Sequence, residues 1–569
     1  MGNKKILIPG LLLCCSLMMH KAFSQAPEAF QYSSRKKVTC KNGAVVSAHP
    51  LASQAGLLML KQGGNAVDAA IATQFALAVV FPEAGNIGGG GFMVVRLANG
   101  KNITLDFREK APGAATENMY LDQQGNPVPG KSLNGHVASG VPGSVAGIFA
   151  AMKYAKLPLD RLIQPAIDLA AKGFVITAAE ARSLNQTQED FKKYNTVLPV
   201  FVKSGGWKAG DTLIQKDLAA TLTRIRNKGR AGFYEGETAR LIAAEMKRGG
   251  GLIDQEDLKN YTAKERQPMV FSYRNEYTVI TMPLPSSGGI LLPQLMRMME
   301  DRNLAASGFQ TVQSVHLMTE TERLAYADRA KYLGDPDFFK APVDSLISYS
   351  YLRKRMSGFD PATAGNSETV KAGEFAESDE TTHLSTYDRE GNAVSLTTTL
   401  NGGYGCRTVV GGAGFLLNNE MDDFSVKPGV PNMFGALGGE ANAIRPGKRM
   451  LSSMTPTIVL KNNKPFLVVG TPGGTTIITS VFQTLVNIID FHLSPEDAVN
   501  KPKFHHQWRP DTLYLEKGVP EAVADSLRSM GYHTLPRRSI GRTEVIEISE
   551  DGLIEAVADK RGDDGAEGY

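Results

Sequence analysis

The chain of 569 residues has few cysteines and almost no net charge, and both shortages narrow what it can be. Of its four cysteines only Cys40 and Cys406 lie beyond residue 24, so no disulfide framework is indicated and we expect the two thiols to stay unpaired. The formal charge is +4, and three of the lysines behind it lie within residues 1–24, which leaves +1 for the remainder. Because no basic tract stands out, nucleic acid is not an expected partner.

Long apolar runs are also missing, apart from one near the N-terminus. Residues 6–19 are apolar but too short to span a bilayer, two lysines precede them, and small residues at 22–24 suit a cleavage site. We therefore predict a signal peptide over residues 1–24 and a mature protein in the periplasm or outside the cell, with no transmembrane segment. A lipoprotein signal at Cys14 or Cys15 is the alternative, although leucines fill the three positions before Cys14.

The composition of the chain changes abruptly at Thr381. Residues 361–380 are rich in Ser, Thr, Gly, Ala and acids and poor in large apolar groups, which predicts a solvated, mobile linker. The segments 383–387 and 393–400 are rich in Thr, Val, Leu and Tyr, and the turn residues 388–392 separate them, so a β-hairpin is expected.

This hairpin predicts a pairing between two threonines. Thr381 and Thr399 are equidistant from Glu390, and residues at symmetric positions of an antiparallel pair have Cβ atoms roughly 4.5–5.5 Å apart. Asn401 shares the face of Thr399. A Thr-rich hairpin can also be an ordinary solvent-facing sheet, so the pattern alone leaves both interpretations open.

The segment TTHLSTYDREGNAVSLTTTLN (381–401) resembles the start of the small subunit of the γ-glutamyltranspeptidases, also called glutathione hydrolases, which belong to the N-terminal nucleophile hydrolases. Further motifs resemble the same family in the same order. They are GGNAVDAAIATQFALAVVFPEAGNIGGGGFMVV (63–95), LDFREKAP (105–112), GVPGSVAG (140–147), MPLPSSGG (282–289), LLNNEMDDFSVKPGVPN (416–432), LSSMTPTIV (451–459), GTPGGTTII (470–478) and KFHHQW (503–508).

The resemblance implies that the chain cuts itself between Glu380 and Thr381 into a large subunit, 25–380, and a small subunit, 381–569, which stay together as a heterodimer. It implies a four-layer αββα sandwich of the α+β class shared by both subunits. Thr381 would then be the nucleophile, and its new α-amine the base, since an amine with a pKa near ~7.7–8.0 is close to neutral pH. No cofactor and no metal are implied.

The resemblance also assigns roles within the site. Thr399 would orient the Thr381 hydroxyl, and Gly473 and Gly474 would line the oxyanion hole, although Pro-Gly-Gly read alone is only a turn. An amino acid head group needs a cation for its carboxylate and an acid for its ammonium. The implied carboxylate ligands are Arg108, Ser452 and Ser453, and the implied ammonium ligands are Asp423, Asn401 and Glu420; Asp422 is expected to face away.

With these contacts, the implied activity is transfer of a γ-glutamyl group from glutathione or a related compound to water, an amino acid or a dipeptide. Two alternatives remain. One is an acylase for a glutaryl-type amide, which lacks the ammonium that Asp423 would bind. The other is a non-catalytic binding protein that never cuts itself.

Three other features have simpler interpretations. The glycine run 88–91 leads into a strand-like segment rather than a helix, so we expect close packing beside the site and not phosphate binding. His505 and His506 are adjacent and lack further ligands, which indicates a structural role rather than a metal site. His383 is expected to be a packed structural histidine.

Two departures from the family pattern stand out. Met450 occupies a position where the family commonly has proline, so the rigidity of the segment before Ser452 is in question. Phe434 lies in a loop that covers the site in many bacterial relatives, where tyrosine is frequent. Because a phenylalanine has no hydroxyl to hold such a loop, we predict easier access for water and a higher share of hydrolysis than of transfer.

Helices are expected over 66–80, 146–154 and 217–228.

Overall fold

The computed structural model describes Gly2, residues 32–370 and residues 381–569, apart from positions 428, 431, 434 and 436. The described residues from Tyr32 onward belong to one folded unit. The predicted signal peptide, Glu380 of the predicted cleavage junction and Phe434 all lie outside the described residues.

Two seven-stranded sheets form the centre of this unit. The first contains, in order, β1 (Lys37–Cys40), β18 (Ile554–Val557), β17 (Glu544–Ile548), β13 (Lys464–Gly470), β12 (Thr457–Lys461), β9 (Tyr277–Thr281) and β8 (Met269–Tyr273). The second contains β19 (Gly565–Gly568), β2 (Gly43–Ser47), β10 (Thr382–Asp388), β11 (Ala393–Thr399), β3 (Gly90–Arg96), β4 (Asn102–Asp106) and β7 (Lys264–Arg266). Neighbouring strands in both sheets are antiparallel.

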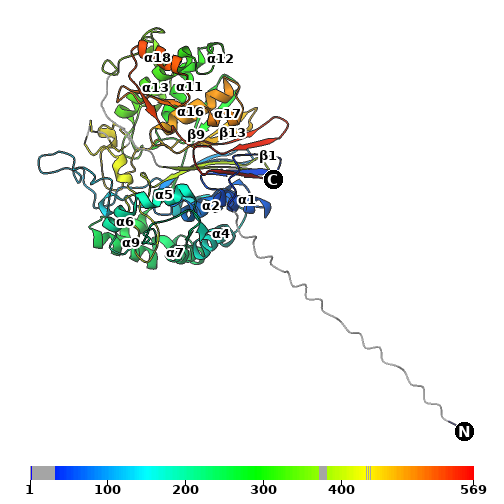
Figure 1. The fold of residues 1–569 in the computed structure, drawn as a ribbon, viewed down its shortest axis with the longest axis vertical. Helices are drawn as coiled ribbons and strands as arrows, with labels where there is room; N and C mark the ends of the chain where they lie inside the picture. Colours follow the sequence, from blue (N-terminus) through cyan, green and yellow to red (C-terminus); the bar gives the residue numbers. More distant parts are fainter. Residues whose placement is uncertain are drawn as a thin grey trace. The chain divides into compact units, whose positions relative to one another are not determined.

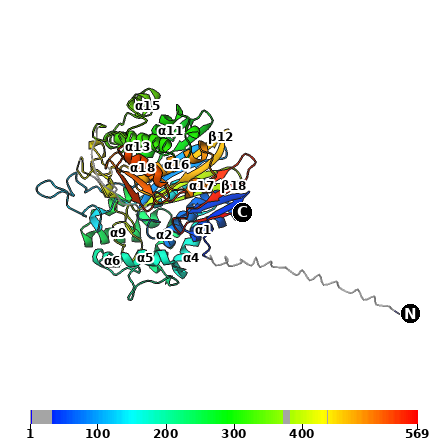
Figure 2. The same ribbon diagram turned by 45° about the horizontal axis from the view of Figure 1, so that its top comes forward.

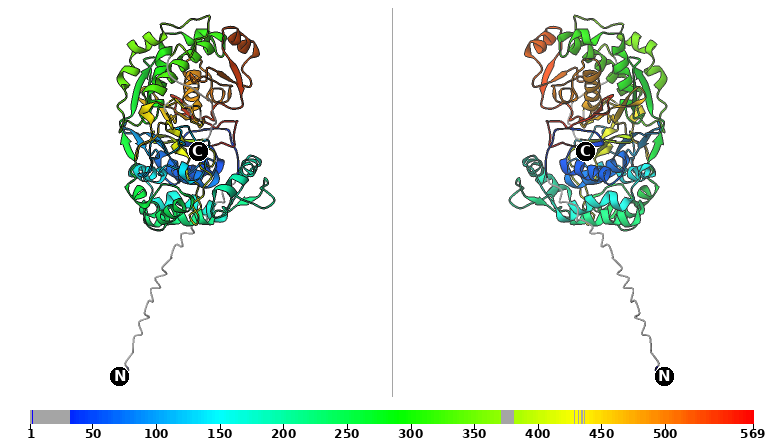
Figure 3. Two further views of the ribbon diagram at one scale, coloured as in Figure 1. Left: turned by 90° about the vertical axis from the view of Figure 1, so that its left-hand side faces the viewer. Right: turned by 90° about the vertical axis from the view of Figure 1, so that its right-hand side faces the viewer.

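The two sheets lie face to face (Figures 1 and 3), and buried apolar side chains fill the layer between them. Successive side chains of a strand point to opposite faces, and this alternation is visible on β12 and β13. Ile458 and Val468 point into the layer between the sheets, together with Val46 of β2. Val459 and Leu467 point to the other side, into a second core beneath helices. The centre of the first sheet therefore buries both of its faces.

Helices cover the outer face of each sheet, as Figures 1 and 2 show. Over the first sheet lie α11 (Gly288–Glu300), α13 (Val312–Tyr332), α16 (Thr476–Ile489), α17 (Pro495–Asn500) and α18 (Glu521–Ser529). On the side of the second sheet lie α1 (Pro50–Lys61), α2 (Ala66–Val80), α3 (Ser144–Ala151), α4 (Leu159–Lys172), α7 (Lys216–Lys228) and α9 (Gly236–Gly249). The layers run helix, sheet, sheet, helix, so the predicted αββα sandwich is confirmed.

The predicted helices are present. Helix α2 has the bounds expected from the sequence, and its start is fixed by a capping box in which Asn65 and Asp68 each satisfy the other's backbone N–H. The expected helix over 146–154 is α3 followed by a 3₁₀ turn, Met152–Tyr154. The third is α7, which begins one residue earlier than expected.

The predicted hairpin is formed by β10 and β11, with Thr382 paired to Thr398. Its turn is held by the Asp388 carboxylate, which accepts bonds from the backbone N–H of Glu390 at 2.8 Å and of Ala66, at the start of α2, at 2.8 Å. The hairpin lies in the middle of the second sheet, with β2 on one side and β3 on the other, and both strands are almost wholly buried. The alternative of an ordinary solvent-facing hairpin is therefore wrong.

Of the predicted linker over 361–380, the structure describes the first ten residues. They form no helix or strand and most of them are exposed, as expected, but hydrogen bonds tie this segment to the other predicted subunit, so the expectation of a mobile segment is wrong here. Residues 371–380 lie outside the described part. The Trp508 indole N–H donates to the carbonyl oxygens of Ser367 and Val370, at 3.1 and 2.7 Å. The Ser367 N–H donates to Asp511 at 2.8 Å. The segment is therefore exposed along most of its length, while its backbone is held against the other predicted subunit at Ser367 and Val370.

The glycine run 88–91 packs against the hairpin as expected. A Cβ atom placed on Gly89 would lie 2.0 Å from the Thr399 carbonyl oxygen, far inside van der Waals contact. Only a residue without a side chain lets this segment approach the end of β11 so closely. The prediction of close packing beside the site is confirmed.

The histidines and cysteines are buried. His505 bonds Thr479 at 2.8 Å and His506 approaches Asp511 at 3.2 Å, which supports a structural role for both. Cys40 and Cys406 are buried free thiols. Among the residues that the structure describes, none of the helices combines the length and the apolar character that crossing a bilayer requires.

His383 of β10 is fully buried, with Thr397 at 2.9 Å and Ser385 at 3.1 Å from its ring nitrogens, so the prediction of a packed structural histidine is confirmed. Burial lowers its pKa to about 3, against about 6.5 in an unfolded chain. Between these values the unfolded chain binds more protons, so stability falls as pH drops through this range, by up to about 1.4 kcal/mol per pH unit.

We therefore expect His383→Gln to make the loss of stability on acidification shallower. The measurement is the thermal-unfolding midpoint of both proteins at several values between pH 5 and 7.5. His506, whose pKa burial lowers to about 4, supplies a remaining slope. Equal slopes for the two proteins would show that His383 is not the group responsible.

Candidate functional site

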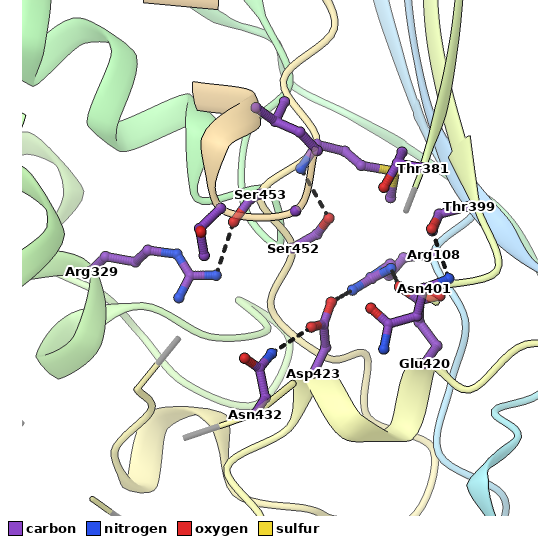
Figure 4. A pocket seen from close by; sticks show the side chains of 14 residues that line it. Arg108, Arg329, Thr381, Thr399, Asn401, Glu420, Asp423, Asn432, Ser452 and Ser453 are labelled. Atoms are coloured by element: carbon purple, nitrogen blue, oxygen red, sulfur yellow. Dashed lines mark hydrogen bonds and ion pairs between the residues drawn. The ribbon is translucent and has the colours of Figure 1, made fainter. Parts of the chain in front are cut away.

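A pocket with an empty volume of about 290 Å³ opens where the ends of β10 and β11 meet the start of α16 (Figure 4). Nine of the ten site residues expected from the sequence line it, and the tenth, Gly473, directly precedes Gly474. The lining residues are Arg108, Arg329, Thr381, Thr399, Asn401, Glu420, Asp423, Asn432, Ser452, Ser453, Met454, Gly474, Thr475 and Ile477.

The two threonines lie at one end of the hairpin. Extending the observed register by one residue sets Thr381 across from Thr399, as the sequence predicted. Thr381 is 6% exposed and lines the pocket directly before β10 begins. The Thr399 hydroxyl accepts the Asn401 N–H at 2.7 Å, and Asn401 adopts a left-handed backbone with φ 75°, which turns the chain out of β11 and into the pocket wall.

Gly473 and Gly474 form the approach to a helix. Their φ values of 136° and 53° lie in the region that favours glycine, and a Cβ on Gly473 would lie 2.4 Å from the Thr476 hydroxyl oxygen. Thr476 starts α16, so the pocket faces a helix N-terminus, where backbone N–H groups lack helical partners and the dipole favours negative charge. The Tyr326 hydroxyl donates to the Thr475 carbonyl and fixes this loop from α13.

The charged part of the pocket centres on Arg108, which follows β4 and is fully buried. Its guanidinium pairs with Glu420 and Asp423, and lies 3.5 Å from Glu109. Although burial opposes it, the three carboxylates raise the pKa of Arg108 above its usual range. Burial raises the pKa of Glu420, Asp423 and Glu109, the last to about 8, and Arg108 partly offsets each rise.

The choice between Asp423 and Asp422 has a geometric reason. Residues Glu420–Asp423 form a 3₁₀ turn, in which positions three apart lie on the same face. Glu420 and Asp423 therefore both face Arg108. Asp422 points elsewhere, and accepts bonds from the Ser132 hydroxyl and the Met433 N–H, both at 2.6 Å.

The segment carrying Ser452 and Ser453 is rigid despite Met450. The Ser452 N–H donates to the Pro285 carbonyl at 2.9 Å, and the Ser452 carbonyl accepts both the N–H and the hydroxyl of Ser287 at 2.7 Å. Met450 is fully buried in an apolar cluster, and its carbonyl faces Arg108. Tertiary hydrogen bonds replace the rigidity that a proline would have given.

Five lining residues were not expected from the sequence: Arg329, Asn432, Met454, Thr475 and Ile477. The Asn432 side chain donates to Asp423 at 2.7 Å. Arg329 reaches the pocket from α13 and donates to the Ser453 hydroxyl at 3.1 Å (Figure 4). Each of the five lies in or next to a motif or a helix, but no feature of the surrounding sequence indicates that its side chain faces the pocket. Over the same described residues no cluster of three or more His, Cys, Asp or Glu side chains is arranged to hold a metal ion.

Comparisons with known proteins agree with this geometry. The model of the gamma-glutamyltranspeptidase family matches residues 52–569. The chain is 46% identical over 545 residues to the glutathione hydrolase proenzyme of Escherichia coli, which covers 94% of this chain and 93% of that protein.

Two solved structures are also similar. The cephalosporin acylase from Bacillus halodurans is 28% identical, with a TM-score of 0.82 over 96% of this chain and 99% of that one. Helicobacter pylori gamma-glutamyltranspeptidase is 49% identical, with a TM-score of 0.56 over 57% of this chain and 94% of the solved one. The family match spans nearly the whole chain and the site residues expected from that family gather in one pocket, so this protein belongs to the gamma-glutamyltranspeptidase family.

Proposed function

We propose that this chain is a γ-glutamyltransferase and glutathione hydrolase that becomes active by cutting itself between Glu380 and Thr381. The observation that carries the proposal is the pocket itself. Thr381 stands at one side, a glycine loop before a helix N-terminus stands beside it, and a buried group of one arginine and three acids lies opposite. A nucleophile, an oxyanion site and a zwitterion site thus adjoin one another.

In the first reaction the Thr381 Oγ1 attacks the Glu380 carbonyl carbon, the C–N bond breaks, and the acyl group moves to oxygen as an ester. Water then hydrolyses the ester. The products are subunits 25–380 and 381–569, and Thr381 now carries a free α-amine, which has an ordinary pKa near ~7.7–8.0 and can act as base. The two sheets supply the reason for the subunits to stay together, since each combines strands from both sides of the cut.

In the second reaction the same hydroxyl attacks the side-chain carbonyl of a γ-glutamyl donor. The α-amine takes the hydroxyl proton and passes it to the departing amine, which is Cys-Gly when the donor is glutathione. Backbone N–H groups of Gly473 and Gly474 would stabilise the oxyanion. Water releases glutamate from the resulting ester, and an amino acid or dipeptide amine gives a new γ-glutamyl peptide.

The head group determines which carbonyl meets Thr381. Asp423, with Glu420 and Asn401, would bind the α-ammonium, while Arg108, Ser452 and Ser453 would bind the α-carboxylate. Holding both charges of the α-carbon leaves the γ-carbonyl as the group in reach. The N-terminal residues 1–24 support export, and we propose a periplasmic or secreted enzyme.

The second candidate is an acylase for glutaryl-type amides, which the similarity to a cephalosporin acylase favours. A glutaryl group carries the carboxylate but not the ammonium. With a glutaryl group, Asp423 would keep its contacts with Arg108 and Asn432 but would have no ammonium of the substrate to bind, so an acid lining this side of the pocket favours the first candidate.

The two candidates are separated by comparing γ-glutamyl p-nitroanilide with glutaryl p-nitroanilide. We expect kcat/KM to favour the γ-glutamyl substrate by roughly 10- to 100-fold, the effect of one hydrogen-bonded charge pair. Asp423→Asn should lose most of this preference, whereas the adjacent Asp422→Asn should keep it. A wild type that prefers the glutaryl anilide would establish the acylase instead.

A further inference from the structure

Arg329 is the second cation of the pocket, and neither the self-cleavage nor the acyl transfer described above uses it. It stands on α13, opposite the β4 end that carries Arg108, and is 6% exposed. Its Nε donates to the Ser287 hydroxyl at 3.0 Å and its Nη2 donates to the Ser453 hydroxyl at 3.1 Å (Figure 4). A buried guanidinium has thus been directed at two serine hydroxyls.

The two arginines of the pocket differ in how their charge is balanced. Arg108 has three carboxylates within ion-pair distance. Among the described residues, no carboxylate lies within ion-pair distance of Arg329, whose contacts are the two serine hydroxyls. Burial lowers the pKa of Arg329, although Asp423 works against that shift, and an arginine remains charged in any case. The positive charge that the protein leaves without an acidic partner therefore lies on the Ser453 side.

Ser453 shows what this charge is for. A hydroxyl has one proton to donate and two lone pairs to accept with. The Ser453 oxygen accepts from Arg329, and among the described residues no other group hydrogen-bonds this hydroxyl, so its proton is left for a group in the pocket. A cation behind the oxygen also strengthens it as a donor, since hydrogen bonds next to an ionised group are stronger than neutral ones.

Arg329 also fixes where Ser453 stands. Its second contact, Ser287, donates to the Ser452 carbonyl through both hydroxyl and backbone N–H at 2.7 Å. One guanidinium therefore ties α13 to the start of α11 and to the serine segment together.

We propose that Arg329 is a positioning residue for the donor's α-carboxylate: it holds the Ser453 hydroxyl with its proton toward the pocket and supplies the uncompensated charge that a carboxylate balances. This inference rests on the proposed function, because it assigns the carboxylate subsite of the same pocket. It adds a second buried cation to that subsite, which acts through Ser453 beside the direct contact assigned to Arg108.

The test compares two competitive inhibitors of the cut enzyme with γ-glutamyl p-nitroanilide as reporter. L-glutamate carries the α-carboxylate, and L-isoglutamine carries a carboxamide there with everything else unchanged. We expect Arg329→Met to raise the inhibition constant of L-glutamate roughly 10- to 100-fold and that of L-isoglutamine far less. The KM of the anilide should rise with it while kcat changes little, because the contact is the same before and during reaction.

Three further proteins sharpen the comparison. Arg329→Lys keeps the charge and should retain part of the preference for L-glutamate. The double variant Arg329→Met with Ser453→Ala should cost little more than either change alone, because the two act as a unit. Lys331→Met removes an exposed cation from the same helix and should change neither constant.

The outcomes separate the two proposals. If Arg329→Met weakens both inhibitors equally, or neither, the role of Arg329 is overturned. If the wild type cuts itself but does not hydrolyse the γ-glutamyl anilide, the proposed function fails instead. Arg329 is then tested with glutaryl p-nitroanilide as reporter and glutarate against its monoamide, where the same carboxylate preference is expected.

A variant that stays uncut does not end the test. Should Arg329→Met not process, the pair Arg329→Lys and Ser453→Ala carries the same comparison, because Ser453→Ala removes the hydroxyl that Arg329 orients. A Ser453→Ala enzyme with the full wild-type preference for L-glutamate over L-isoglutamine would then overturn the proposal.

Discussion

Replacing Thr381 by alanine should leave the chain as one uncut polypeptide and reduce γ-glutamyl anilide hydrolysis by at least ~10³-fold, since the variant has neither the nucleophile nor the free α-amine. The measurement is a denaturing gel with intact mass, followed by the anilide assay. Thr381→Ser keeps a hydroxyl on the same backbone and should still cut itself. The uncut wild type at full length after prolonged incubation would contradict the mechanism and favour a non-catalytic binding protein.

The neighbouring residue offers a matched control. Thr382 is fully buried, and its hydroxyl oxygen makes no hydrogen bond in the described structure. Thr382→Val has nearly the same shape and removes only that unpartnered hydroxyl, so processing and activity should both persist. If Thr382→Val also abolished cutting, the loss in Thr381→Ala would reflect disturbance of β10 rather than loss of the nucleophile.

The sequence was sufficient to predict the hairpin and its register. Turn residues at 388–392 fixed the midpoint, and an antiparallel pair then leaves only one partner for Thr381. Helix α2 was predictable for a similar local reason, because Asn65 and Asp68 cap a largely apolar run that only Asp68, Thr73 and Gln74 interrupt. The sequence did not indicate that the hairpin lies in the middle of a sheet, because its neighbours β2 and β3 come from more than 280 residues away in the chain.

The segment 361–370 shows the opposite case. Its small polar residues are typical of a linker, and nothing local indicates that Trp508 and Asp511 bind its backbone. Met450 is similar, because the hydrogen bonds that compensate for it come from residues 285–287, far away in the sequence. Local composition indicates the conformations that a segment favours on its own, but not the hydrogen bonds that it forms with distant residues in the fold.

The candidate site divides in the same way. Residues within recognisable motifs, such as Arg108 and Asp423, could be named from the resemblance. Arg329 could not, because a single arginine in a long helix has no local signature, and its function depends on Ser453 more than 120 residues later. The mutual pairing of Arg108 with Glu420 and Asp423 was also not foreseen, since the sequence assigned them opposite halves of one ligand.

Because of that pairing, we expect the loss of Arg108 to lower the free energy of unfolding strongly. Arg108→Met leaves Glu420, Asp423 and Glu109 buried without their shared cation, and breaking a buried ion pair by removing one partner costs about 3–5 kcal/mol. The comparison is best made in a Thr381→Ala background, where every variant is one uncut chain and processing does not interfere. The measurement is the thermal-unfolding midpoint at a fixed scan rate.

The destabilisation caused by Arg108→Met should increase as pH rises. Without Arg108 the pKa values of the three acids rise further above their unfolded values, so the folded state binds more protons and loses stability as pH rises. Arg108→Met should therefore be much more destabilised at pH 8 than at pH 5. Adding Glu420→Gln and Asp423→Asn should restore much of the loss, because neutral side chains need no cation, whereas the exposed Arg445→Met should have no effect at either pH. A loss equal at both pH values would mean that Arg108 supports the fold by packing and hydrogen bonds rather than by its charge.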